Sequence, residues 1–475
     1  MSDLSFTSAT ELARLVRERA VSPVEIVDGC LDRIEKIDPS INAFVALVGD
    51  RAREEARRAE ALVMRGGELP ALLGVPIGIK DLNLTEGITT TFSSKAFANF
   101  VPEVDHSTVR RMRSAGMLVL GKTNTPEFGS VPVTESDLNG DCHNPWDPDK
   151  TPGGSSGGSG AAVAAGMVPV AQGTDGGGSV RIPASCCGLF GIKPARGRVS
   201  HSPSTGEAWS GLSTDGVLAR TVQDGAALLD VMSGYETGDP YWAPSPARPF
   251  AAEVGRDPGN LRIAFSAIAP NGASPDPEVA AALADAAHLL EELGHQMEES
   301  APDWVEPEAA GFYLKLTWFV NAAYYDFDDL SLLEPFNQVF AELGRETSSF
   351  DYIKARVRAE RYTRKVVGFW NDFDLLLTPT VALPPPDVGW VMEPDDPWDK
   401  AARSGMFIPY TPIANITGQP AVNVPLYWSE TGLPLGVQLI GRPADEATLI
   451  RVASQLEEAR PWAERRPAMS YLDHL

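Results

Sequence analysis

The sequence predicts an α/β fold in which strands and helices alternate along the chain. Short apolar runs bounded by glycine and proline are typical of buried strands. Longer segments carry apolar residues at helical spacing, several with capping residues at the first turn, and are typical of amphipathic helices. Because alternating strands and helices pack as layers, both observations favour an α/β layered fold.

The first part of the chain is predicted to be helical. Ser22 and Glu25 form a capping-box pattern with Pro23 at the first helical position, and apolar residues continue at helical spacing through Ile37. The segment 50–65, DRAREEARRAEALVMR, has the composition of a charged surface helix. Helices are therefore expected before the first strand.

The strands are predicted from apolar runs that begin at the segment GVPIGIK. The predicted strands are 74–80, 117–121, 167–174, 261–267, 373–380 and 421–428. A helix is expected over 276–294, with Asp276 as its N-cap. Two proline-rich stretches, 241–250 and 381–400, are predicted to be irregular connections.

Composition excludes several classes of function. The chain has 475 residues, of which 43% are hydrophobic and 22% charged, so a globular core is expected. Its formal net charge of −24 disfavours nucleic acid as a partner. No signal peptide is recognisable, and no apolar run reaches the roughly 18 residues of a membrane span, so no membrane partner is expected.

Cysteine usage indicates a reduced, cytoplasmic protein. The four cysteines, Cys30, Cys142, Cys186 and Cys187, contain no CxxC pair. They are interpreted as packed free thiols rather than as a disulfide framework or a zinc site. No metal and no organic cofactor is expected.

Residues 116–123, GMLVLGKT, match the phosphate-loop pattern but predict a strand instead. A phosphate loop follows a strand and opens a helix, whereas the four middle residues here are all apolar and Asn124-Thr125-Pro126 comes next. Nucleotide binding is therefore a weak alternative.

Residues 153–157, GGSSG, match the nucleophile elbow of a Ser-His-Asp hydrolase. That elbow requires a strand before the serine, whereas NPWDPDKTP precedes it here and reads as a loop. The later histidines are His201, His288, His295 and His474, of which His288 lies in a helical apolar pattern and His474 is the penultimate residue. They are interpreted as structural or solvent-facing. A Ser-His-Asp site stays open as a weak alternative.

Three separated pieces suggest another hydrolytic site, beginning with Lys80. Lys80 ends an apolar strand whose residues Val75, Ile77 and Ile79 suggest burial. Burial lowers the pKa of a lysine, and a neutral amine is a usable general base. The alternative is an ordinary surface lysine.

The other two pieces are Ser155-Ser156 and the run from Gly176 to Ser179. The serine pair directly precedes a predicted helix of small residues, 157–165, and could also be its N-cap. Gly176, Gly177 and Gly178 offer successive backbone N–H groups, which an oxyanion hole requires. The alternative for the glycines is a tight turn.

The chain resembles the amidase signature hydrolases. The resemblance is carried by GGSSGGSGAAVAAG, GTDGGGSVRIPASCCGLFGIKP and GVPIGIKD, with Ser155 and Ser179 24 positions apart. It extends over nearly the whole chain through VLGKTNTPEFG, HNPWDP, LLLTPT and NITGQPAVNVPL. It implies one domain, 1–475, with a large mixed central β-sheet covered by helices on both faces. The implied catalytic core is about 70–240, and a helical, aromatic-rich variable lid is about 300–370.

The resemblance also implies the catalytic set. Ser179 is the implied nucleophile, Ser155 a relay after a cis peptide bond, and Lys80 the base, acting through an acyl-enzyme. The amides of residues 176 to 179 are implied to receive the oxyanion.

Neighbouring residues are implied to support this set. Asp175 and Arg181 would hold the glycine loop, with an ordinary ion pair as the alternative, and Ser156 would support Ser155. At Gly176 the family more often has a larger residue, so a looser oxyanion hole or a wider pocket is expected.

The implied substrate is a small-molecule amide. Aryl or bulky apolar amides are expected, with carbamates (urethanes) and esters as extensions. The loop 127–133 should border the pocket, with Gly129 near the carbonyl, while Trp209 and the aromatic segment 312–327 form either a pocket wall or ordinary core. A monomer or homodimer is expected. The alternative is the glutaminase-type A subunit of an aminoacyl-tRNA amidotransferase complex.

Overall fold

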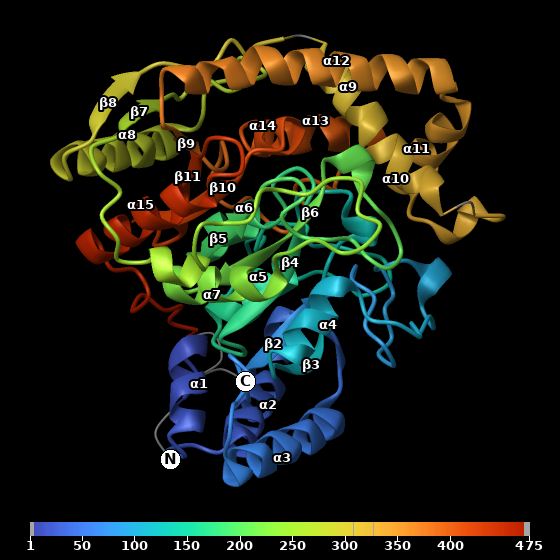
Figure 1. The fold of residues 1–475 in the computed structure, drawn as a ribbon. Helices are drawn as coiled ribbons and strands as arrows, with labels where there is room; N and C mark the ends of the chain where they lie inside the picture. Colours follow the sequence, from blue (N-terminus) through green and yellow to red (C-terminus); the bar gives the residue numbers. More distant parts are fainter. Residues whose placement is uncertain (1–3, 307, 326, 470–475) are drawn as a thin grey trace.

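A large mixed β-sheet runs through the protein. The computed structural model describes residues 4–306, 308–325 and 327–469 (Figure 1). Within these ranges, eleven strands form one sheet in the order β1-β3-β2-β4-β6-β5-β10-β11-β9-β7-β8. β2 pairs in parallel with β3 and β4. In the run β4-β6-β5-β10-β11-β9, each strand pairs antiparallel with the next. β7 pairs in parallel with β8 and β9. The predicted mixed sheet is confirmed.

All six predicted strands are present, most of them shorter than expected. They are β2 (Pro76–Lys80), β3 (Leu118–Thr123), β4 (Val170–Asp175), β7 (Arg262–Phe265), β9 (Leu375–Pro379) and β10 (Ala421–Trp428). Five further strands were not predicted: β1 (Phe44–Leu47), β5 (Phe190–Lys193), β6 (Thr214–Ala219), β8 (Gln296–Glu299) and β11 (Pro434–Ile440). Because β3 covers most of the phosphate-loop match, that segment is a strand, as expected.

Helices cover both faces of the sheet, as side chains along β6 show. Val217 packs in a core cluster with residues of α7 (Val222–Met232) and α15 (Glu446–Ala459). The next residue, Leu218, packs in a different cluster with residues of α2 (Pro23–Ile41) and α5 (Gly157–Ala164). Successive residues of a strand point to opposite faces, so both faces are buried under helices.

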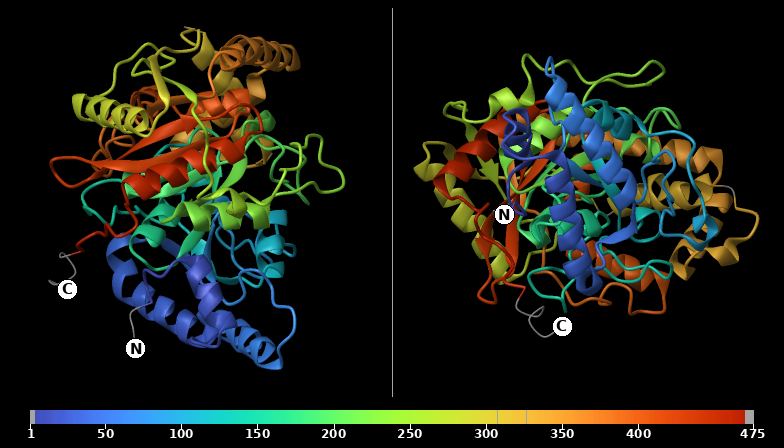
Figure 2. Two further views of the ribbon diagram at one scale, coloured as in Figure 1. Left: turned by 60° about the vertical axis from the view of Figure 1, so that its left-hand side comes forward. Right: turned by 90° about the horizontal axis from the view of Figure 1, so that it is seen from below.

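The N-terminal helices lie at one end of the molecule (Figures 1 and 2). They are α1 (Ala9–Arg17), α2 and α3 (Gly49–Arg65). The predicted capping box is formed, since Ser22 Oγ accepts from Val24 N at 3.0 Å and Glu25 Oε2 accepts from Ser22 N at 2.9 Å. α2 extends beyond the predicted periodicity to Ile41.

A group of helices lies at the opposite end (Figures 1 and 2). It consists of α9 (Ala309–Leu316), α10 (Trp318–Tyr324), α11 (Pro335–Glu346) and α12 (Ser349–Val367). The remaining helices are α4 (Ser107–Ser114), α6 (Arg181–Cys187), α8 (Pro277–Glu292), α13 (Pro397–Phe407) and α14 (Pro412–Thr417). No helix of the described ranges is long and apolar enough to cross a membrane.

Two predicted segments can be compared in detail. Asp276 caps α8 as expected, accepting from Glu278 N at 2.8 Å. The stretch 381–400 was predicted to be irregular throughout, but α13 begins at Pro397. Asp396 caps it by accepting from Trp398 N at 2.7 Å, and the proline occupies the first turn, where its missing N–H is not needed.

Candidate active site

Lys80 lies at the end of β2, the third strand from one edge of the sheet. Its side chain is fully buried, so the surface-lysine alternative is wrong. Nζ lies 2.7 Å from Ser155 Oγ and 2.8 Å from Thr174 Oγ1. β4, which carries Thr174, is the parallel neighbour of β2, so the sheet brings these two side chains together.

The surroundings of Lys80 favour its neutral form. Burial lowers the pKa of Lys80 to about 7, against the opposing influence of the Asp175 and Asp215 carboxylates. A large fraction of the amine is therefore unprotonated near neutral pH and able to accept a proton. The burial inferred from the flanking apolar residues is confirmed.

The serine pair lies at the start of α5. The peptide bond between Gly154 and Ser155 is cis, as the resemblance implied. Ser156 occupies the N-cap position of α5, but its side chain makes no capping bond. Instead its hydroxyl bonds to the backbone of Thr174, donating to the carbonyl oxygen at 3.2 Å and accepting from the amide at 3.3 Å. Ser156 therefore fixes the strand residue that contacts Lys80.

Ser156 also links the two serine segments. Its amide donates to the carbonyl oxygen of Ser179 at 3.2 Å. Ser155 and Ser179 both line one cavity. The structure thus brings Lys80, Ser155 and Ser179 to the same place. Thr174 also belongs to this site, although its sequence context predicts only a strand residue.

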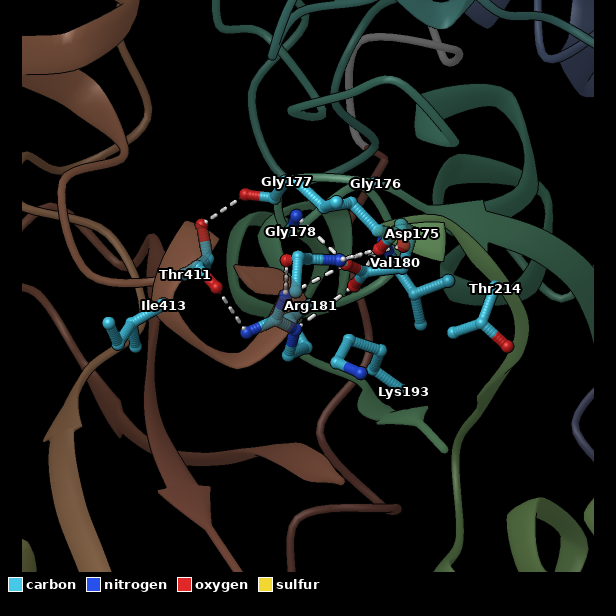
Figure 3. A network of polar contacts seen from close by, with 12 residues as sticks. Asp175, Gly176, Gly177, Gly178, Val180, Arg181, Lys193, Thr214, Thr411 and Ile413 are labelled. Atoms are coloured by element: carbon cyan, nitrogen blue, oxygen red, sulfur yellow. Dashed lines mark hydrogen bonds and ion pairs between the residues drawn. The ribbon is translucent and has the colours of Figure 1, made fainter. Parts of the chain in front are cut away.

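Asp175 organises the glycine loop that follows β4 (Figure 3). Its carboxylate accepts from Gly178 N at 2.9 Å and from Val180 N at 3.2 Å, and it pairs with Arg181 Nη2 at 2.8 Å. Burial alone raises the pKa of Asp175, but the charge and hydrogen bonds of Arg181 outweigh it and lower the pKa to about 2. Asp175 therefore forms an ion pair with Arg181 and also holds the glycine loop, so both expected roles are present.

The amide of Gly178 does not belong to the oxyanion hole as predicted. Its N–H was expected among the donors to the substrate, but it is occupied by Asp175 Oδ1. In the described ranges, no hydrogen bond is formed by the amides of Gly176, Gly177 or Ser179. Those three amides remain as candidate donors, and Gly178 serves to shape the loop.

Residues more than 200 positions away clamp the same loop (Figure 3). Thr411 Oγ1 donates to Gly177 O at 2.6 Å, and Arg181 Nη1 donates to Thr411 O at 2.9 Å. Asn415 Nδ2 donates to Asp175 O at 2.8 Å, while its Oδ1 accepts from Arg181 at 2.7 Å. Asn415 is the first residue of the motif NITGQPAVNVPL, and this family motif is the feature of the sequence that points to Asn415.

The space beside Gly176 is filled by an indole ring. A Cβ atom at Gly176 would lie 2.6 Å from Trp209 Cε3, which is closer than real Cβ contacts allow. Tyr313 contacts the same glycine, since its hydroxyl donates to Gly176 O at 3.1 Å. The expectation that Gly176 widens the pocket is therefore wrong, because Trp209 takes up the room of a larger side chain. A looser oxyanion hole stays a prediction.

The serines open into a cavity of about 340 Å³. Gly129 lines it, and a Cβ atom there would lie 2.9 Å from Ser155 Oγ. Of the loop 127–133, Phe128 and Gly129 reach the cavity. One wall is aromatic: Phe92, Phe97, Phe100, Phe128, Trp209, Tyr324 and Tyr325.

The aromatic segment after Phe312 serves both of its expected purposes. Tyr324 and Tyr325 line the cavity, and Tyr325 stacks on Phe128 with ring centroids 4.9 Å apart. Phe312 is core, packed against Tyr362, and Phe319 is buried against Phe340. The end of the segment thus contributes two residues to the aromatic wall, while Phe312 and Phe319 belong to the core.

The histidines do not complete a Ser-His-Asp site. Within the described ranges, no histidine hydrogen-bonds to Ser155 or Ser179. His288 is exposed on α8, and His295 bonds to Gln455 at 2.9 Å. His201 lines the cavity with its Nε2 on Ser213 O at 3.1 Å, and His474 lies outside the described residues.

The cysteines and acidic side chains add no further centre in the described ranges. Cys30, Cys142, Cys186 and Cys187 are buried free thiols. No group of three or more His, Cys, Asp and Glu side chains that could hold a metal ion occurs within 4–306, 308–325 and 327–469.

Comparison with known proteins identifies the family. The sequence profile of the family described as Amidase matches residues 25–450. The chain belongs to the amidase signature family. A relative from Synechocystis sp., named an amidase, is 41% identical over 466 residues, covering 96% of this chain and 89% of the relative. The 6-aminohexanoate-cyclic-dimer hydrolase of Paenarthrobacter ureafaciens is 36% identical over 97% of this chain and 96% of its own.

Solved structures of the amidase signature family have the same fold. The structure of a 6-aminohexanoate cyclic dimer hydrolase complexed with substrate superposes with a TM-score of 0.92 at 35% identity, covering 98% of this chain and 99% of that chain. The family membership makes the protein an enzyme, an amidase acting on amide bonds.

Proposed function

We propose that this amidase cleaves carboxamide C–N bonds with Ser179 as nucleophile, Ser155 as proton relay and Lys80 as general base. The contact of 2.7 Å between Lys80 Nζ and Ser155 Oγ carries the proposal. A buried amine with a pKa of about 7, adjacent to a serine hydroxyl, has the properties of a base at neutral pH.

Each proton in the proposed cycle has a donor and an acceptor. Lys80 Nζ takes the proton of Ser155 Oγ, which takes the proton of Ser179 Oγ as that oxygen attacks the substrate carbonyl. The tetrahedral oxyanion accepts hydrogen bonds from the amides of Gly176, Gly177 and Ser179. The relay returns the proton to the leaving nitrogen as the C–N bond breaks. Water then attacks the acyl carbonyl and gives its proton to the relay. The relay returns that proton to Ser179 Oγ as the ester C–O bond breaks, and the acid is released.

The cavity supports aryl or bulky apolar amides as substrates. Its aromatic wall offers apolar surface and ring contacts to a substrate body. Carbamates and esters present the same carbonyl to the same donors, so we extend the proposal to urethanes. The cavity is lined from both 70–240 and 300–370, which supports these ranges as catalytic core and variable lid of one domain.

Hydrolysis of a p-nitroanilide tests the proposed roles. Ser179→Ala and Lys80→Met should each lower kcat by about 10³-fold or more, since residues acting as a unit fail together. Lys122→Met is the matched control, because Lys122 is equally buried but bonds to Asn83 O, Thr85 Oγ1 and Thr90 Oγ1 instead of a site serine. Near-normal turnover by folded Lys80→Met would contradict the assignment of the base.

Two further assays separate the alternatives. Aryl carbamate and matched anilide, measured side by side, test the urethane extension, and absent carbamate turnover removes it. Size-exclusion chromatography of the purified chain, with the anilide assay on each fraction, tests the amidotransferase-subunit alternative. Full activity in a fraction that contains only this chain contradicts that alternative.

A further inference from the structure

Besides its aromatic residues, the cavity is lined by polar residues that the proposed reaction does not use. Asn83, His106, His201, Ser213 and Asp215 all line it. Asp215 is 1% exposed, and all its side-chain bonds within the described ranges fall on one oxygen. Oδ2 accepts from Asn83 Nδ2 at 2.8 Å and from Thr108 Oγ1 at 3.0 Å.

The other carboxylate oxygen of Asp215 is open for a ligand. In the described ranges, Oδ1 forms no hydrogen bond and no Lys or Arg pairs with Asp215. The nearest ring is that of His106, whose Nδ1 lies 3.4 Å from Oδ2. Burial lowers the pKa of His106 to about 4, so this imidazole is uncharged at neutral pH and does not neutralise the carboxylate.

The second carboxylate of the cavity, that of Glu207, has a cationic partner. Glu207 also lines the cavity, but its Oε1 lies 3.9 Å from Arg356 Nη1. Asp215 is thus the carboxylate that faces the cavity without a cationic partner in the described ranges. A buried carboxylate is costly unless a cation or several donors satisfy it, so the site favours a positively charged ligand group.

Strand register places this carboxylate beside the reacting groups. Asp215 on β6 is the direct antiparallel partner of Thr174 on β4. Side chains of such a pair have Cβ atoms about 4.5–5.5 Å apart. Because Thr174 Oγ1 lies 2.8 Å from Lys80 Nζ, a group on Asp215 would be a few bonds from the scissile amide.

We infer that Asp215 forms a subsite for a substrate ammonium group. This inference rests on the proposed amide hydrolysis and names its substrate class: amides with an apolar body for the aromatic wall and a primary amine, protonated at neutral pH, for Asp215 Oδ1. The ammonium donates to Oδ1 in a charge-assisted hydrogen bond. Asn83 and Thr108 keep the carboxylate in place through Oδ2.

The test compares matched charged and neutral substrates in the wild type and in Asp215→Asn. One series pairs ω-aminoacyl p-nitroanilides of three to six carbons with the acyl p-nitroanilides of equal length. A second series pairs N-(aminoalkyl)benzamides with N-alkylbenzamides. In at least one series, Asp215→Asn should lower the ratio of kcat/KM for charged over neutral substrate about tenfold or more, as expected for a charge-assisted bond.

The ratio separates binding from indirect effects. Asp215 also influences Lys80 electrostatically, but any change in that base alters both members of a pair equally and leaves the ratio unchanged. Asp215→Glu should retain part of the preference. Asp50→Asn, which removes the same charge from a fully exposed position, should leave the ratio unchanged. An equal effect of Asp215→Asn on both members in both series would overturn the inference.

Ligand binding by calorimetry tests the subsite without turnover. Wild-type protein should bind 4-phenylbutylammonium about tenfold or more tightly than 4-phenylbutan-1-ol. Equal affinities would overturn the inference even if Asp215→Asn fails to fold. If the wild type binds the ammonium selectively but hydrolyses none of the amides, the proposed function fails and the subsite stands.

Discussion

Lys80 and Ser155 are 75 residues apart in the sequence, yet Lys80 Nζ lies 2.7 Å from Ser155 Oγ. The contact joins the end of a buried parallel strand to a residue that follows a cis peptide bond. A lysine in this position is deprived of water, and its pKa falls to about 7. The proposed chemistry depends on this one relationship.

The first prediction concerns pH. Lys80 must be neutral to accept a proton, so kcat/KM for a neutral anilide should rise as pH increases through about 7 and level off above it. The rate below the pKa should fall about tenfold per pH unit. Initial rates from pH 5 to 9, at constant ionic strength, measure this. An acid limb that stays flat down to pH 5 would contradict a neutral Lys80 as base.

The second prediction concerns Gly129. Gly129→Ala places a methyl group 2.9 Å from Ser155 Oγ at a backbone φ of +68°. Displacement of the serine should lower kcat about 10²-fold.

Gly140→Ala is the matched control. Gly140 has a φ of +75°, and its nearest new contact is Asn42 Nδ2 at 3.4 Å. It should show the cost of left-handed backbone, about 1–2 kcal/mol in stability, with kcat unchanged. Equal kcat values for the two variants would show that the methyl group at Gly129 does not disturb Ser155.

The third prediction concerns the buried ion pair of Asp175 and Arg181. Asp175→Asn leaves the Arg181 guanidinium buried without its countercharge, so the free energy of unfolding should fall by about 3–5 kcal/mol. The exposed Asp387, which pairs with the half-buried Lys150, is the control, and Asp387→Asn should cost at most about 1 kcal/mol. Urea titration followed by fluorescence measures both. Similar losses would mean that the buried pair contributes no more than a surface pair.

The fourth prediction concerns Gly176 and Trp209. Gly176→Ala should lower kcat/KM, because the added methyl group meets the indole at 2.6 Å and pushes the loop or the ring aside. In the double variant with Trp209→Ala the clash is gone. The two substitutions should therefore couple by about 0.5–3 kcal/mol in a double-mutant cycle on kcat/KM. Additive effects would show that the two residues do not compete for the same space.

The sequence was informative for some features that depend on neighbouring residues. The burial of Lys80 could be predicted from its flanking apolar residues, whereas the roles expected of Ser155, Asp175 and Arg181 came from the family resemblance. The strands β2, β4 and β10 were predictable for the same reason, as short buried runs between turn residues.

The sequence does not reveal the role of a residue when that role depends on strand register or on contacts between distant segments. Thr174 reads as one more strand residue until β4 is aligned with β2. Thr411 and Asn415 reach the glycine loop across 234 and 240 positions. The N–H of Gly178 was assigned to the substrate because only the folded loop shows that Asp175 already accepts from it. Trp209 likewise fills the space at Gly176 from a separate segment.

Covalent labelling of the active-site serine tests whether Ser179 is the nucleophile and Lys80 its base. The wild type is treated with a fluorophosphonate, digested, and mapped by mass spectrometry. We expect one adduct, on the peptide that contains Ser179. It should be absent in Ser179→Ala and should form much more slowly in Lys80→Met. An adduct on Ser155 instead, or labelling of folded Ser179→Ala at the wild-type rate, would contradict it.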